Sequence, residues 1–101
     1  MAHKMQHTMQ HKMQHKMLLH GLGQNSDSWE KVLDCLPAEQ KEQLHTPNLF
    51  DLTEDICYEG LYRGWEQTCQ QLSGKLHLCG LSLGAVLALD YAIRHPQQVE
   101  S

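Results

Sequence analysis

The stretch that decides the fold is Lys75-Leu76-His77-Leu78-Cys79-Gly80-Leu81-Ser82-Leu83-Gly84-Ala85. A short apolar run ends in Gly-x-Ser-x-Gly, and a helix-forming run, residues 86–94, follows at once. This order predicts a strand, a sharp turn and a helix. A serine at the apex of so tight a turn is strained, and a side chain at Gly80 or Gly84 would crowd the neighbouring backbone. The turn would expose the Ser82 hydroxyl over a helix start, whose partial positive charge favours a developing anion.

A second stretch has a similar organisation nearer the N-terminus. Residues 18–29 read Leu-Leu-His-Gly-Leu-Gly-Gln-Asn-Ser-Asp-Ser-Trp, an apolar strand end followed by a glycine-bearing loop and a helix start. Together the two stretches resemble the α/β-hydrolase superfamily, in which a His-Gly-x-Gly loop and the serine turn build an acyl-transfer site. The resemblance covers residues 17–101. It implies an α/β fold, a partial three-layer sandwich with three parallel strands that correspond to the family's third, fourth and fifth, and flanking helices.

The resemblance also implies roles for individual residues. Ser82 would be the nucleophile of a carboxylic-ester hydrolase or a related acyl hydrolase, acting on a small, partly apolar molecule. The backbone N–H groups of Leu22 and Leu83 would hold the oxyanion. The residues that would support the turn and the loop are Gly80, Gly84, His20 and Gly21. His20 stands at a family position that shapes the loop, and is a poor substitute for the catalytic base.

The family's remaining catalytic residues, an acid and a histidine, should follow the serine in the chain. After Ser82 the acids are Asp90 and Glu100, and the histidine is His95. A helix would carry His95 ~15 Å from Ser82 at ~1.5 Å per residue, whereas a base must lie within ~3 Å. Asp90 would lie in the middle of the same helix and cannot serve as the catalytic acid for the same reason. The catalytic set is therefore incomplete in these residues, and we expect negligible ester turnover from this chain alone.

Composition limits the other classes of function. A length of 101 residues allows one small domain, less than half of what a hydrolase of the resembled kind usually needs. The sequence has no run of about 18 apolar residues, so it predicts no membrane span. Four cysteines without a C-x-x-C pair, in a chain without an export signal, predict reduced thiols and a cytoplasmic location. Residues 18–101 carry five basic and twelve acidic side chains, which disfavours nucleic-acid binding.

Residues 3–17 form a four-residue repeat, His-Lys-Met-Gln with one threonine in place of lysine. This composition predicts a disordered segment, residues 1–16, ahead of a folded domain, residues 17–101. A tag or a repeat expansion would explain it. Histidines at i, i+4 would share one helix face and give a weak option for binding Zn²⁺ or Ni²⁺; these are His3, His7, His11 and His15. We expect no cofactor.

The remaining pattern predicts three further elements. A helix over residues 29–36 would pack Trp29, Val32, Leu33 and Leu36 into the core. A strand over 44–52 would follow, and then a helix over 53–72, capped by residues 53–55. Residues 97–101 look like the lead-in to another strand. In family order the strand before His20 lies between the other two, which leaves both sheet edges unpaired and favours self-association.

Two alternatives to a hydrolase remain open. The chain would also suit a non-catalytic fragment that binds or assembles through its sheet edges, or a metal binder that uses the histidine repeat.

Overall fold

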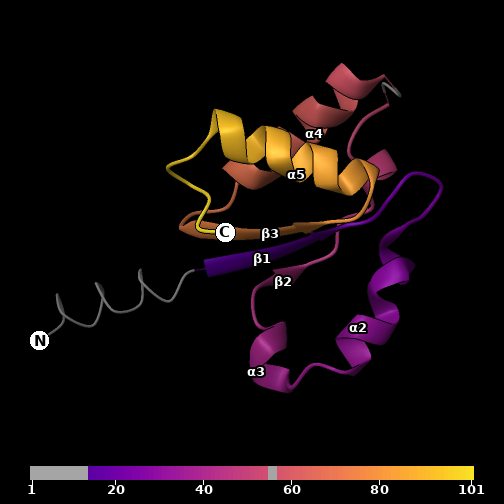
Figure 1. Ribbon diagram of the computed structural model, residues 1–101, viewed down its shortest axis with the longest axis vertical. Coiled ribbons are helices and arrows are strands. Elements are labelled where there is room, and N and C mark those ends of the chain that lie inside the picture. Colours follow the sequence, from indigo (N-terminus) through magenta and orange to yellow (C-terminus); the bar gives the residue numbers. More distant parts are fainter. Residues whose placement is uncertain (1–13, 55–56) are drawn as a thin grey trace, which may run out of the picture.

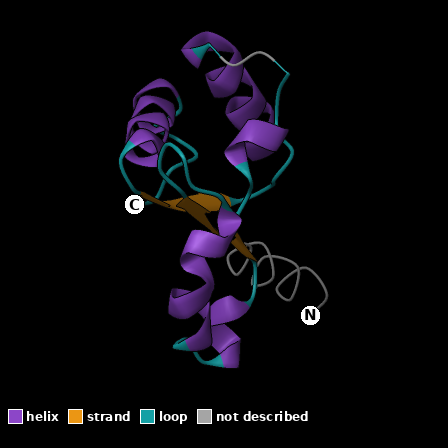
Figure 2. Cartoon of the chain, turned by 90° about the vertical axis from the view of Figure 1, so that its right-hand side faces the viewer, coloured by secondary structure: helices purple, strands orange, loops and turns teal. Residues whose placement is uncertain are grey.

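The computed structural model describes residues 14–54 and 57–101 (Figure 1). In chain order the elements are β1 (Gln14–Leu19), η1 (Ser26–Trp29), α2 (Glu30–Asp34), α3 (Ala38–Lys41), β2 (Leu44–His45), η2 (Leu49–Asp51), α4 (Tyr58–Gln70), β3 (Lys75–Gly80) and α5 (Leu83–Arg94). Helices α4 and α5 cover one face of the sheet and α2 and α3 lie on the other, so the chain has three layers (Figures 1 and 2). The predicted α/β class is confirmed.

The three strands are parallel and follow the order β2-β1-β3, as predicted. β1 pairs with β3 along its whole length, from Gln14 opposite Lys75 to Leu19 opposite Gly80. β2 adds only two paired positions. The β1–β3 pair is therefore the main support of the sheet, and both strands end where the two glycine-bearing loops begin.

β1 begins at Gln14, three residues earlier than the expected boundary at Met17. Its burial alternates, with His15, Met17 and Leu19 buried and the residues between them half-buried. In the repeat, His and Met stand two residues apart. Since successive residues of a strand point to opposite faces, His15 and Met17 both point to the buried face. The last repeat unit is thus part of the sheet, while residues 1–13 lie outside the described residues.

The predicted strand over 44–52 is wrong beyond its first two residues. The chain leaves the sheet after His45, and residues 49–51 form a 3-10 turn instead. Pro47 has no N–H to give to a strand ladder. The N–H of Leu49 donates to the His20 ring at 2.9 Å, so a side chain takes the hydrogen bond that a strand would have used.

The prediction that both sheet edges are unpaired is also wrong at β3. Residues 98–101 run alongside that strand: the N–H of Leu76 donates to Gln98 O at 2.9 Å, and the N–H of Glu100 donates to Leu76 O at 2.8 Å. A parallel bridge joins Leu76 and Val99. The expected lead-in to a further strand is therefore already paired with the sheet.

The core lies between the sheet and the α4–α5 layer. Its buried apolar residues are Met17, Leu19, Leu49, Leu61, Tyr62, Trp65, Cys69, Leu76, Leu87, Ala88 and Tyr91. Trp65 packs edge-on against Tyr91, and its ring N–H donates to Leu87 O at 3.2 Å. This hydrogen bond satisfies the polar atom of a fully buried indole and ties α4 to α5.

The opposite layer is less well packed, which corrects one expectation. No residue of η1, α2 or α3 is buried. Trp29, Leu33 and Leu36 are half-buried, and Val32 is 43% exposed. The predicted helix is also split, with a 3-10 turn over 26–29 and only five α-helical residues after it. So short a segment cannot present a full apolar face to the sheet.

α4 begins later than the predicted cap at residues 53–55. Its N-cap is Cys57, whose sulfur accepts from the Gly60 N–H at 3.5 Å. Leu61, Trp65 and Cys69 of this helix are buried, while Ile56, within the predicted range, lies outside the described residues. Burial raises the pKa of the Cys69 thiol, so this cysteine packs as an apolar side chain.

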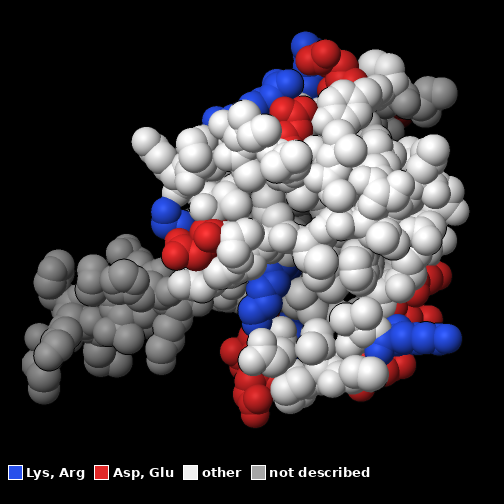
Figure 3. All heavy atoms as spheres, viewed as in Figure 1, with Lys and Arg blue, Asp and Glu red and all other residues white. Residues whose placement is uncertain are grey.

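The outer face of α5 is apolar and uncovered. Val86, Leu89 and Ile93 are 53%, 62% and 69% exposed and share one side of the helix. Figure 3 shows charged side chains mainly over α4 and around α2 and α3, with a largely uncharged area over α5. Among the described residues, no helix has the length and apolar character needed to cross a membrane.

Two histidines face one another where β1 meets β2. His15 Nδ1 lies 3.0 Å from His45 Nε2. Burial, and after it the nearby His15 ring, lower the pKa of His45 below its usual 6.5. The folded chain therefore favours the neutral form of His45.

This lowered pKa predicts a loss of stability in acid. The unfolded chain takes up the His45 proton first as the pH falls, so stability is complete above about pH 6.5 and declines below it as the pH approaches the lower pKa of the folded state. The His45→Gln variant should show a shallower decline in melting temperature between about pH 7 and pH 5. Identical slopes for the two proteins, measured by thermal unfolding, would contradict this assignment.

Candidate functional site

Ser82 occupies a strained position between β3 and α5. Its φ of 56° and ψ of −117° lie in a region that side chains rarely adopt, and it is the N-cap of α5. The N–H of Gly84 donates to Leu81 O, and the N–H of Ala85 donates to Ser82 O, both at 2.9 Å. These hydrogen bonds close the turn and hold the serine at its apex, at the carboxyl end of the strand.

The two glycines of this turn let three segments of backbone meet. A Cβ on Gly80 would lie 2.3 Å from Gly84 O, and a Cβ on Gly84 would lie 2.3 Å from Leu19 O. Real Cβ atoms do not approach backbone so closely. The first turn of α5 therefore rests directly on the end of β1, and the N–H of Leu81 donates to Leu19 O at 3.0 Å beside this contact.

His20 is fully buried at the end of β1, and both of its ring nitrogens are engaged. Nε2 accepts from the Leu49 N–H at 2.9 Å, so it carries no proton. Nδ1 therefore carries the proton and donates to Gly21 O at 2.9 Å. With its acceptor nitrogen occupied by a backbone N–H, His20 links two loops and is not available to remove a proton from Ser82.

The Gly21–Leu22 peptide is oriented by hydrogen bonds to its carbonyl. Gly21 O accepts from His20 Nδ1 and from the Gln24 N–H at 3.2 Å. In a trans peptide the N–H points opposite to the C=O, so the Leu22 N–H is directed away from these donors. A Cβ on Gly21 would lie 3.2 Å from both Leu81 O and Ser82 Cβ, which places this loop against the serine turn.

The two predicted oxyanion donors have no acceptor among the loop and turn hydrogen bonds of the described residues. Between residues of the described ranges, no backbone hydrogen bond employs the N–H of Leu22 or of Leu83. The Leu22 side chain is 72% exposed. The structure thus leaves a backbone donor on each of the two loops that contact one another at Ser82.

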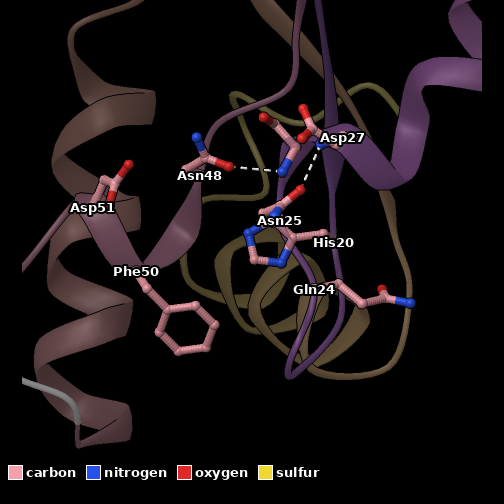
Figure 4. A pocket seen from close by; sticks show the side chains of 8 residues that line it. His20, Gln24, Asn25, Asp27, Asn48, Phe50 and Asp51 are labelled. Carbon is pink, nitrogen blue, oxygen red and sulfur yellow. Dashed lines mark hydrogen bonds between the residues drawn. The ribbon is translucent and has the colours of Figure 1, made fainter.

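A cavity of about 330 Å³ opens beside the loop that follows β1 (Figure 4). It is lined by His20, Gln24, Asn25, Ser26, Asp27, Asn48, Phe50 and Asp51. Asn48 Oδ1 accepts from the Ser26 N–H at 2.6 Å, which joins the loop after β1 to the loop after β2. Two carboxylates and no Lys or Arg line the cavity. Ser82 is not part of this lining, but His20 and Gln24 belong to both the cavity and the loop beside the serine.

Sequence analysis did not identify this cavity. A signal was present, because Asn25 and Asp27 follow β1 while Asn48 and Asp51 follow β2. The carboxyl ends of neighbouring parallel strands meet at one edge of a sheet, where ligands commonly bind. The signal was hidden because residues 44–52 were interpreted as one continuous strand.

The acids and the histidine that follow Ser82 lie elsewhere. His95 caps the far end of α5 and is 2.7 Å from Glu66 Oε2. Asp90 accepts from the Tyr58 hydroxyl and from Arg94 Nε, both at 2.8 Å. The hydrogen bond from Tyr58, and after it that from Arg94, lowers the pKa of Asp90. Asp90 and His95 therefore join α5 to α4. Glu100 pairs with Leu76 beside β3.

Among the described residues, both ring nitrogens of His77 also have partners. His77 Nδ1 lies 2.7 Å from Ser101 Oγ, and Nε2 lies 2.7 Å from Gln14 Oε1. Of the four histidines in the weak metal option, His15 faces His45, while His3, His7 and His11 lie outside the described residues. Residues 14–54 and 57–101 contain no group of three or more His, Cys, Asp or Glu side chains arranged to hold a metal ion.

Comparison with known proteins agrees with the α/β class of the fold. The chain is 29% identical over 86 residues to the pimeloyl-[acyl-carrier protein] methyl ester esterase of Nitrosomonas europaea. The match includes 83% of this chain and 33% of that esterase, so the chain spans about a third of the relative's length. No family model matches the sequence, and no solved structure matches it.

The contact between Gly84 and β1 predicts a large cost for the smallest added side chain. In Gly84→Ala the methyl group would meet backbone that cannot move without displacing α5, so we expect a loss of about 3 kcal/mol in the free energy of unfolding. Gly23→Ala is the control, because Gly23 has a φ of 76° but open space around it, and should cost about 1 kcal/mol. Urea unfolding of both variants measures the difference, and equal losses would contradict the packing argument.

The two hydrogen bonds of His20 predict that its replacement weakens the fold. His20→Leu keeps a buried apolar volume but leaves the Leu49 N–H without an acceptor, which should cost about 2 kcal/mol. His77→Leu is the matched control, since its side-chain partners can turn towards water, and should cost less than about 1 kcal/mol. Chemical unfolding decides the point. A His20→Leu variant as stable as His77→Leu would show that the buried bonds contribute little.

Proposed function

We propose that Ser82 is the nucleophile of a serine hydrolase that acts on a carboxylic ester or a related acyl group. The observation that carries this proposal is the strained backbone of Ser82 at the β3–α5 turn, with the Gly21–Leu22 loop packed against it. A fold seldom maintains such strain without a use for the exposed hydroxyl. The similarity to a methyl ester esterase supports the same class of reaction.

The proposed reaction begins with attack of Ser82 Oγ on the ester carbonyl carbon. A bond forms between these atoms and the carbonyl electrons move onto oxygen; their return breaks the bond to the alkoxide, which takes up a proton and leaves as the alcohol, and water then hydrolyses the acyl-serine to the acid and free Ser82. The N–H groups of Leu22 and Leu83 would hold the oxyanion, and the N-terminus of α5 would favour its charge. One such donor contributes about 10²–10³-fold to the rate in enzymes of this kind.

The proton of Ser82 requires an acceptor that the described residues do not provide. His20 precedes Gly21, which packs against the serine turn, but its acceptor nitrogen already binds the Leu49 N–H. His95 lies at the other end of a twelve-residue helix, ~18 Å away at ~1.5 Å per residue. We therefore expect negligible turnover of esters by these 101 residues alone, and propose the hydrolytic activity for a complete enzyme of this type.

The proposed substrate is a small-molecule ester, and the proposed location is the cytoplasm. The location rests on the four free cysteines, which suit a reducing compartment. The ester class rests on the backbone donors at Ser82 and on the name of the similar esterase.

A second candidate function, assembly without catalysis, is favoured by the outer face of α5. Val86, Leu89 and Ile93 form an exposed apolar stripe on that helix, and such stripes are typical of surfaces that other protein covers. Under this proposal the chain would associate through α5, and the backbone at Ser82 would have no chemical role.

Covalent labelling separates the two candidates. A fluorophosphonate probe at millimolar concentration should label the chain slowly at Ser82, because the turn and the donors are preformed while the base is missing. Ser82→Ala should abolish the labelling, and Ser28→Ala, at an exposed serine of η1, should leave it unchanged. Peptide mapping by mass spectrometry locates the adduct. Absence of any adduct at Ser82 would favour the assembly function.

A further inference from the structure

We propose that the Gln24 side chain is a positioning residue that holds the Leu22 N–H towards Ser82. This inference rests on the proposed function, because it concerns the oxyanion donor of that reaction. Gln24 lies in the exposed part of the loop and lines the cavity beside it.

Gln24 closes the loop on Gly21 from both sides. Its side-chain Oε1 accepts from the Gly21 N–H at 2.9 Å, and its backbone N–H donates to Gly21 O at 3.2 Å. Both peptides that flank Gly21 are therefore held, one through its N–H and the other through its C=O. Since glycine has no side chain to restrict its backbone, these hydrogen bonds and the one from His20 set the direction of the Leu22 N–H.

The two hydrogen bonds between Gln24 and Gly21 lie close to the Ser82 side chain. The position that a Cβ of Gly21 would occupy is 3.0 Å from Gln24 Oε1 and 3.2 Å from Ser82 Cβ. These two atoms are therefore at most 6.2 Å apart. A rotation of the Gly21–Leu22 peptide would turn the donor away within this short distance, so the hydrogen bond from Gly21 to Gln24 bears directly on the oxyanion.

His20 and Gln24 both hold the loop after β1, but they differ in how much of the fold depends on them. His20 is fully buried and bonds Leu49, so its loss affects the fold as a whole. Gln24 is exposed, and its side chain bonds only Gly21 among the hydrogen bonds of the described residues. Loss of the Gln24 side chain should therefore release the loop while leaving the core intact, which makes its role separable from stability.

The test compares Gln24→Met with Gln24→Glu in the full chain. Methionine has a similar length but no strong acceptor, so exchange of the Gly21 amide hydrogen should quicken and fluorophosphonate labelling of Ser82 should fall at least tenfold. Glutamate keeps an acceptor at the same reach. Measured at about 0.5 M salt, which screens its added charge, it should keep Gly21 exchange slow and labelling within about threefold of wild type.

A control variant and the contrary outcomes complete the design. Ser28→Ala changes an exposed side chain of η1 outside the cavity lining, and should change neither readout. Wild-type labelling and wild-type Gly21 exchange in Gln24→Met would overturn the positioning role alone. Equal losses in Gln24→Met and Gln24→Glu would overturn it too, since they would assign the effect to the side-chain NH₂. No Ser82 adduct in the wild type would instead overturn the proposed function.

Discussion

The close approach of the first turn of α5 to the end of β1 is the constraint on which the rest of the structure depends. Gly84 lies so near Leu19 O that no side chain fits between them. Because the helix starts this low over the sheet, the chain must reverse within Leu81 and Ser82, and the serine takes up the strain of that reversal. The same contact lets Leu87 and Tyr91 reach the core and gives Trp65 its hydrogen-bond acceptor on α5.

A polar interaction extends this constraint to the second loop. His20 is buried beneath the loop after β1, where an uncompensated ring nitrogen would be costly. The fold satisfies it by bringing the Leu49 N–H to Nε2, and that choice fixes the proton on Nδ1. The proton then orients the carbonyl of Gly21. One tautomer thus connects the segment after β2 with the Gly21–Leu22 peptide, in the loop that packs against the serine turn.

The sequence was most informative where local chemistry decides the structure. The glycine spacing around Ser82, the apolar run of β3 and the helix-forming run of α5 depend on neighbouring residues, and these elements occur where they were predicted. Long-range contacts decided the rest. The length of β1 depends on its pairing with β3. Gln14 and His15 belong to the repeat, whose composition predicted no strand, but they pair with Lys75 and Leu76. Pro47 is a local signal for the end of β2, but the turn at Leu49 also depends on a hydrogen bond to His20, 29 residues away, which no local pattern predicts.

The candidate site shows the same division. Apart from Ser82 and His20, its predicted members are backbone groups and glycines, whose proposed roles follow from the shape of a turn, so a motif can identify them. The role of Gln24 depends on a side chain that folds back onto Gly21, and the cavity depends on Asn48 reaching the Ser26 N–H from another loop. A proton acceptor for Ser82 would likewise have to arrive from a distant segment. The local sequence can therefore specify the proposed place for negative charge, whereas a group able to take the serine proton would have to come from a segment distant along the chain.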